Sequence, residues 1–215
     1  LNMGTGAVTM SASRTVTVNA GNFTVGGNIS GSTFGLTKNG SGTMILSGAN
    51  TYNGTTEING GTLAVSGGSA IADTSAVAIG SGAVFALAAN ETVGSIAGAG
   101  NITLGSFTLT AGGDNSSTTA SGVISGTGAL ILNGSGQLNL SVNNSFTGGV
   151  TVNDGILGLQ NGGIGANGPL TVNGGLVSVS IHDSYDNLVV SELSGSGGLI
   201  DVSRRRLTVD QATDT

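Results

Sequence analysis

The sequence has very little charge, no cysteine and few aromatic residues. Charged residues make up 7% of its 215 residues, against about 25% in a typical soluble protein. Without cysteine, the chain can form neither a disulfide framework nor a thiolate metal site. Its hydrophobic share is nevertheless 38%, which is too high for a disordered glycine linker. We therefore expect an ordered protein whose surface is polar but mostly uncharged.

Basic surface and long apolar runs are also missing. The formal net charge is −6, and the few cations are scattered apart from Arg204, Arg205 and Arg206. A nucleic-acid partner requires a broad basic face, so none is expected. Leu, Val and Ile are separated by Gly, Ser, Thr and Asn, and no run reaches the roughly 18 apolar residues of a membrane helix.

Short stretches of alternating polar and apolar residues are abundant. Residues 43–46 (TMIL), 62–65 (TLAV) and 137–140 (QLNL) are examples, and each predicts a short strand with one buried face. Asn-Gly, Gly-Gly, Ser-Gly and Asp-Gly turns separate such strands roughly every 10 to 13 residues. This spacing alone allows a sandwich, an antiparallel barrel or a parallel solenoid.

An internal repeat favours the solenoid. Residues 36–68 return without a gap at residues 130–162, at an offset of 94, and a solenoid gives each turn the same surroundings by translation. Low charge also fits, because coils stacked at about 4.8 Å would turn a charged position into a ladder of repulsion. If both copies lie on the same faces, 94 residues are a whole number of coils. This predicts four coils of about 23 residues or five of about 19, and nine to eleven coils in all.

The repeated positions are expected to shape the scaffold. They are Leu36, Gly40, Gly42, Leu46, Asn50, Tyr52, Gly54, Gly61 and Leu63 in the first copy, and Leu130, Gly134, Gly136, Leu140, Asn144, Phe146, Gly148, Gly155 and Leu157 in the second. A further motif, VGSIAGAGNI over residues 93–102, matches VSELSGSGGL over residues 190–199.

The first copy closely resembles the autotransporter-associated β-strand repeat, or passenger-associated transport repeat. It matches the family pattern G-L-x-K-x-G-x-G over residues 35–42 and N-x-Y-x-G over residues 50–54. The second copy departs from the pattern at Leu132, Val142 and Phe146, where Lys, Gly and Tyr are usual. The resemblance implies an all-β, right-handed, single-stranded parallel β-helix. It also implies a passenger secreted by a Gram-negative bacterium through a C-terminal membrane barrel outside this chain. The family has no catalytic residue, metal or cofactor to transfer, and residues 1–215 are expected to form one β-helical segment.

Residues 180–192 hold the densest group of functional side chains. A His–Asp pair beside a serine nucleophile and an oxygen-ligand cation site are the two chemical interpretations. Neither spacing is diagnostic, because neighbouring side chains in an extended segment point to opposite sides. We favour a polar loop between coils, and weak ligand binding is the alternative. The residues concerned are His182, Asp183, Tyr185 and Asp186.

Two further features have a binding interpretation beside a structural one. The cluster of Arg204, Arg205 and Arg206 could bind an anionic glycan, although a solvated turn is favoured. Tyr52 and Phe146 could stack on carbohydrate, but packing at a corner is favoured because the Tyr-to-Phe replacement shows that the hydroxyl is dispensable.

Three functions are consistent with this sequence. The favoured one is a non-enzymatic stalk or adhesin segment, secreted or on the cell surface, that assists secretion, presents a rigid rod and meets a host-cell surface or glycan. The second is an extracellular subunit that polymerises into a filament through open β-helix ends, because exposed strand edges pair readily. The third is a β-helical enzyme acting on polysaccharides, which would need clustered carboxylates. The eleven acidic residues are dispersed.

Overall fold

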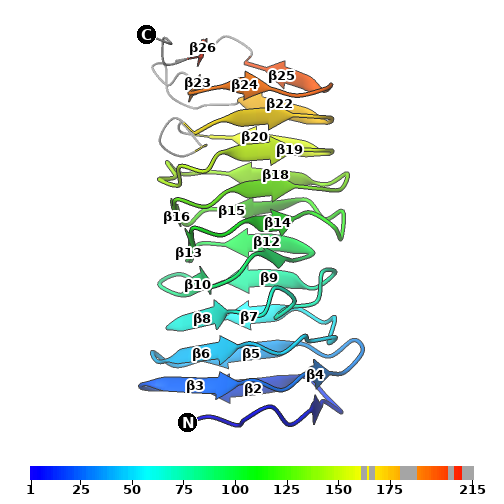
Figure 1. Cartoon of the computed structure of the whole chain (residues 1–215), viewed down its shortest axis with the longest axis vertical. Coiled ribbons are helices and arrows are strands. Elements are labelled where there is room, and N and C mark those ends of the chain that lie inside the picture. Colours follow the sequence, from blue (N-terminus) through cyan, green and yellow to red (C-terminus); the bar gives the residue numbers. More distant parts are fainter. Residues whose placement is uncertain (161–163, 165–167, 180–187, 203–205, 210–215) are drawn as a thin grey trace.

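The computed structural model describes residues 1–160, 164, 168–179, 188–202 and 206–209. All regular elements in these ranges are β-strands, and they stack in parallel into a rod-shaped solenoid of about nine turns (Figure 1). The predicted all-β parallel solenoid is therefore confirmed. Within the same ranges, no helix has the length and apolar character needed to cross a bilayer.

Each coil passes over three parallel sheets. The long sheet has ten strands: β2 (Arg14–Thr17), β5 (Leu36–Asn39), β7 (Thr56–Ile58), β9 (Ala76–Ile79), β12 (Ser95–Gly98), β15 (Thr118–Ala120), β18 (Gln137–Leu140), β20 (Ile156–Leu159), β22 (Leu176–Val179) and β25 (Leu199–Asp201). The second sheet has six: β3 (Asn22–Val25), β6 (Thr43–Leu46), β8 (Thr62–Val65), β10 (Val84–Leu87), β13 (Asn101–Gly105) and β16 (Ile124–Gly126). The third sheet also has six: β11 (Glu91–Thr92), β14 (Leu109–Ala111), β17 (Leu130–Leu132), β19 (Val150–Val152), β21 (Leu170–Val172) and β24 (Leu193–Ser194).

Two short pairs complete the faces. By chain order, β1 (Val8–Thr9) and β4 (Ile29–Ser30) lie on the same face as the third sheet, before β11. In the same way, β23 (Leu188–Val190) and β26 (Leu207–Val209) lie on the face of the second sheet, beyond β16. The second and third faces are therefore each interrupted once, whereas the long sheet is continuous.

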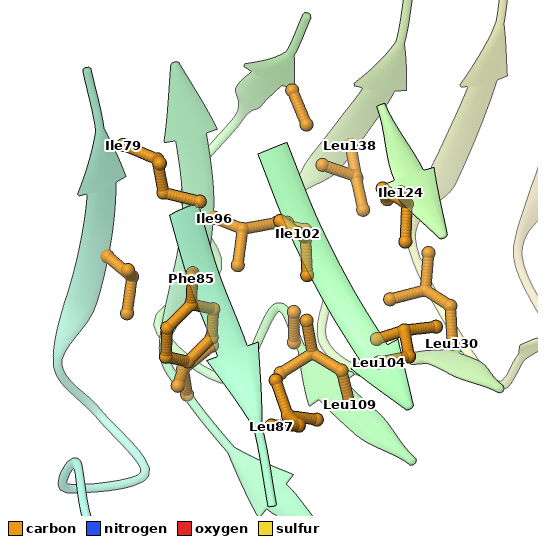
Figure 2. Packing of buried hydrophobic residues seen from close by; sticks show 14 of the residues in the cluster. Ile79, Phe85, Leu87, Ile96, Ile102, Leu104, Leu109, Ile124, Leu130 and Leu138 are labelled. Carbon is orange, nitrogen blue, oxygen red and sulfur yellow. The ribbon is translucent and has the colours of Figure 1, made fainter. Parts of the chain in front are cut away.

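The core consists of the inward residues of all three sheets. Strands such as β6, β8, β9 and β10 alternate half-buried and buried positions, as the two-residue sequence pattern predicted. Figure 2 shows Phe85 from the second sheet, Ile96 from the long sheet and Leu109 from the third sheet pointing into the same interior. All three are completely buried. Each such side chain contributes about 1.5–3 kcal/mol of burial free energy.

The coil length is variable. In the long sheet, Val77 pairs with Ile96, 19 residues further along, whereas Leu176 pairs with Leu199, 23 residues further along. The two predicted coil lengths are thus the extremes of the observed range.

The prediction that the two repeat copies lie on the same faces is wrong. In the first copy, β5, β6, β7 and β8 alternate between the long and second sheets. In the second copy, β17, β18, β19 and β20 alternate between the third and long sheets. Following strand partners upward from Leu36, four coils lead to Thr118, and Leu130 lies two faces further on. All three faces offer the same strand–turn–strand environment, so a repeat must match a whole number of faces rather than of coils.

Repeat glycines mark places where one coil lies against the backbone of the previous one. A Cβ placed on Gly54 would lie 2.5 Å from the Gly35 nitrogen. In the second copy, a Cβ on Gly148 would lie 2.5 Å from the carbonyl carbon of Gly128. Neither glycine has the positive φ that only glycine adopts readily, so the requirement here is for space.

We expect Gly54→Ala to lower the free energy of unfolding by about 1–3 kcal/mol, because the added methyl group overpacks a backbone contact. Gly113→Ala is the matched control, since the nearest atom to a Cβ there is 3.6 Å away and its φ is ordinary. Chemical denaturation of both variants measures the difference. Equal midpoints for the two variants would contradict close packing as the reason for Gly54.

Candidate functional site

The strongest binding candidates from the sequence fall outside the described residues. Arg206 is described and exposed, and its carbonyl oxygen accepts the Leu188 N–H at 3.0 Å. Ligand binding by this group therefore remains a prediction. The residues outside the described ranges are His182, Asp183, Tyr185, Asp186, Arg204 and Arg205.

The described ranges contain no group of three or more His, Asp or Glu side chains that could hold a metal ion. Their most unusual chemistry lies inside the rod, where polar side chains replace missing strands. This set of residues at the interruption of the third face, together with Lys38, is the candidate site that the structure itself defines.

Asn50 replaces strand hydrogen bonds in the first interrupted coil. Its side-chain Oδ1 accepts the Ile29 N–H at 2.7 Å, and its Nδ2 donates to the Ala70 carbonyl at 2.5 Å. The side chain is buried and so joins the coils below and above it in an environment without water. One amide thus continues the ladder across a position that has no strand.

The second repeat copy uses the same device on the second face. Asn144 Oδ1 accepts the Ile124 N–H at 2.8 Å, and the next residue, Ser145, donates its N–H to the Ile124 carbonyl at 2.9 Å. In the first copy, Thr51 donates in the same way to Ile29 at 2.8 Å. The asparagine of the repeat is therefore a coil-to-coil bridge, and its neighbour completes the local pairing.

The aromatic residue of the repeat is fully enclosed. Tyr52 and Phe146 are both 0% exposed, so neither ring is open to a carbohydrate. The Tyr52 hydroxyl is 2.9 Å from the Thr56 hydroxyl. Burial raises the pKa of Tyr52 to about 12, the Thr56 hydrogen bond opposes the rise, and the charge of Glu91 adds to it.

Glu91 closes the second interrupted coil of the third face. Its own backbone belongs to β11, where its N–H donates to the Thr108 carbonyl at 3.0 Å. Its side chain reaches back to the previous coil, where Oε1 accepts the Ile71 N–H at 2.7 Å and Oε2 accepts the Ala70 N–H at 3.3 Å. The residue is 2% exposed. Residues 70–71 therefore receive one polar partner from Asn50 below and another from Glu91 above.

The environment of Glu91 disfavours its charged form. Burial raises the pKa of the carboxyl to about 7, the Ile71 and Ala70 hydrogen bonds oppose this rise, and the charge of Asp73 adds to it. Glu91 thus titrates near neutral pH in the folded protein.

Lys38 is a second ionisable residue in an inward position. Its side chain is 0% exposed, yet its Nζ donates to the carbonyl oxygens of Gly40 at 2.9 Å, Gly60 at 2.8 Å and Asn39 at 3.4 Å. The stem packs in the core while the ammonium reaches half-buried turns. Burial lowers the pKa of Lys38.

Outside the core, asparagines of the turns form short ladders. Asn59 donates to Asn39 at 3.0 Å in the first copy. In the second copy, Asn153 donates to Asn133 at 2.7 Å and Asn173 continues the ladder at 2.8 Å. These contacts satisfy polar groups between coils without placing like charges above one another.

Sequence reasoning missed the role of Glu91. The available signal was the match between residues 93–102 and 190–199, which places Glu91 opposite Leu188. Leu188 is also buried and also begins the strand that resumes an interrupted face. An acidic residue opposite a core leucine could have indicated a buried carboxylate.

Comparisons with known proteins agree with the repeats. The family model described as passenger-associated-transport-repeat matches residues 36–65 and 130–159. The chain is 35% identical over 133 residues to the Adhesin BmaC autotransporter of Brucella suis biovar 1 (strain 1330), an alignment covering 60% of this chain and 4% of that protein. The chain thus spans a small fraction of that relative's length. No solved structure matches the chain. The family recognised in the sequence is confirmed.

We expect Asn50→Ala to cost about 2–4 kcal/mol of unfolding free energy, because it leaves the buried Ile29 N–H and Ala70 carbonyl without partners. The exposed ladder residue provides the control: Asn59→Ala should cost less than about 0.5 kcal/mol. Thermal or chemical unfolding of both variants tests this. An Asn50→Ala variant as stable as Asn59→Ala would show that the bridge contributes little.

We expect Lys38→Met to change the unfolding free energy by less than about 1.5 kcal/mol, because methionine keeps the buried stem and the turn carbonyls can bond to water. Leu132 occupies the equivalent position in the second copy. Lys38→Ala should cost about 2 kcal/mol or more, because it leaves a cavity. If Lys38→Met is as destabilising as Lys38→Ala in chemical denaturation, the ammonium rather than the stem is what the fold needs.

Proposed function

From the two passenger-associated transport repeats carried on a parallel solenoid, we propose that this chain is a rod segment of an autotransporter passenger. Its role is non-enzymatic: it holds adhesive parts of the passenger away from the bacterial outer membrane. The observation that carries the proposal is the continuous core of the rod, which joins all three faces along the described chain. The similarity to a protein named as an autotransporter adhesin supports the same role.

The rod is suited to this role by its stiffness. The ten parallel strands of the long sheet are hydrogen-bonded from β2 to β25 without a break. The chain repeats its register at every coil, so each coil provides the edge on which the next one pairs. We propose that this coil-by-coil folding outside the cell also assists export, with a C-terminal membrane barrel in the longer protein as the route.

Binding partners belong to the same proposal. A host-cell surface or a glycan is the expected partner of the whole passenger. Within this chain, any contact is assigned to residues 180–192 and to the cluster of Arg204, Arg205 and Arg206, where glycine turns give way to charged side chains. An enzymatic role is not favoured, because the described carboxylates are spread over the faces and corners of the rod.

End-to-end association is a second candidate with its own observation. The first coils enclose an apolar cavity of about 120 Å³, which Met3, Val8, Phe23, Val25 and Ile29 help to line. Another coil placed against this end would fill the cavity and pair with β2 and β3. A second copy of the chain could provide that coil.

We expect a passenger in which residues 1–215 are replaced by an unrelated β-solenoid with as many coils to keep its adherence to host cells, because a rod acts through its length. Deletion of the same residues should reduce adherence. Cell-adhesion counts measure both variants, with protease accessibility of the passenger as the control for display on the surface.

Two outcomes would contradict the rod function. Loss of adherence in the replaced passenger, despite normal display, would place binding in this chain. Turnover of a polysaccharide by the purified chain would make it an enzyme. Filaments of the purified chain in electron micrographs would favour the second candidate.

A further inference from the structure

The interruption of the third face leaves one place in the rod where a coil depends on a single titratable side chain. Residues 69–73 run between β8 and β9 and form no strand. Ala70 and Ile71 nevertheless direct their N–H groups toward the next coil, as strand residues would. The partner they meet is the carboxylate of Glu91 rather than a backbone carbonyl.

We propose that Glu91 is a proton-controlled latch, which holds residues 69–73 against the rod more firmly when it is protonated than when it is ionised. The latch is a conformational device of this chain and does not rest on the proposed adhesive function. Opening would release the two N–H bonds and expose the carboxylate to water, while β8 and β9 remain paired in their own sheets.

Geometry gives the latch its leverage. Both carboxylate oxygens of Glu91 are engaged by the same short segment, at 2.7 Å from the Ile71 nitrogen and 3.3 Å from the Ala70 nitrogen. Ile71 is itself completely buried, so opening at this point also exposes an apolar side chain. The segment therefore opens as a unit, and the ionisation of one group alters the free energy of that opening.

The groups around Glu91 set the direction of the effect. Tyr52 faces it from the coil below and is neutral near pH 7, because burial raises its pKa to about 12. Asp73 lies in the latched segment and disfavours a second negative charge. Leu109, the strand partner in the coil above, has no charge. Asp114, also in the coil above, accepts hydrogen bonds from the Ser95 hydroxyl and the Ser116 N–H.

The sign follows from these surroundings. Because burial raises the pKa of Glu91 to about 7, from a usual value of 4.5, the open segment loses its proton at lower pH than the closed one. Below about pH 4.5, both states are protonated and closure is strongest. Between about 4.5 and 7, closure weakens as pH rises, and above about 7 it stays at its weaker level.

Amide hydrogen exchange at Ala70 and Ile71 tests the latch. After correction for intrinsic exchange, we expect their protection in the wild-type chain to fall by about tenfold or more between about pH 5 and about pH 8, a value lowered to allow for partial solvent screening. Glu91→Gln should show no such fall, because it removes the proton equilibrium and keeps an acceptor for Ile71. Glu57→Gln, at an exposed carboxylate of the long sheet, should behave like the wild type.

A third variant separates the latch from a general loss of packing. Glu91→Leu removes both acceptors, so Ala70 and Ile71 should exchange rapidly at both pH values while β14 and β17 stay protected. Wild-type protection that is flat with pH would overturn the proposal even if no variant folded. An unchanged pH-dependent fall in Glu91→Gln, or wild-type protection in Glu91→Leu, would also overturn it.

Discussion

The hydrogen-bond ladder between successive coils is the constraint on which the structure depends. Each coil must present its N–H and carbonyl groups to the coils on either side, because the interior has no water to satisfy them. Where strands are regular, the backbone meets this requirement by itself. Where a face is interrupted, a side chain must take over, which explains why Asn50, Asn144 and Glu91 are buried although they are polar.

The same ladder determines what the sides of the rod can contain. Outward side chains lie above one another at the strand spacing, as Thr151 and Thr171 do on the third sheet. Hydroxyl groups can bond along such a column, and Thr171 is 3.0 Å from the Ser194 hydroxyl. Like charges at this spacing repel. The scarcity of charge is thus a property of stacked coils rather than of a particular ligand.

The fold was largely predictable because its signals are local. Alternation in residues 43–46 or 137–140 identifies strands, and the repeat identifies a solenoid. The faces of the repeat were mispredicted because the phase of a 94-residue offset depends on the summed lengths of several coils. Those lengths vary with insertions at the corners, as the steps of 19 and 23 residues show. A one-dimensional pattern does not determine that sum.

The interior site was less predictable for a different reason. Lys38 sits in the repeat pattern, yet only the coordinates show that its stem lies in the core and its ammonium at three turn carbonyls. Glu91 lies outside both copies, and its partners are backbone groups about 20 residues away. Backbone partners have no residue type, so they leave no trace in the sequence. Asn50 and Tyr52 were recognised as repeat positions, but their bridging and enclosed roles depend on the missing strand.

The change of face between the two copies has a mechanical consequence. One copy interrupts the third face and the other interrupts the second, so the two weak positions lie on different sides of the rod. The repeat therefore acts as a screw operation, and a third copy at the same offset would interrupt the long sheet. Three copies would distribute their defects evenly around the axis. A long rod assembled in this way has no seam along which it bends or splits in preference to any other direction.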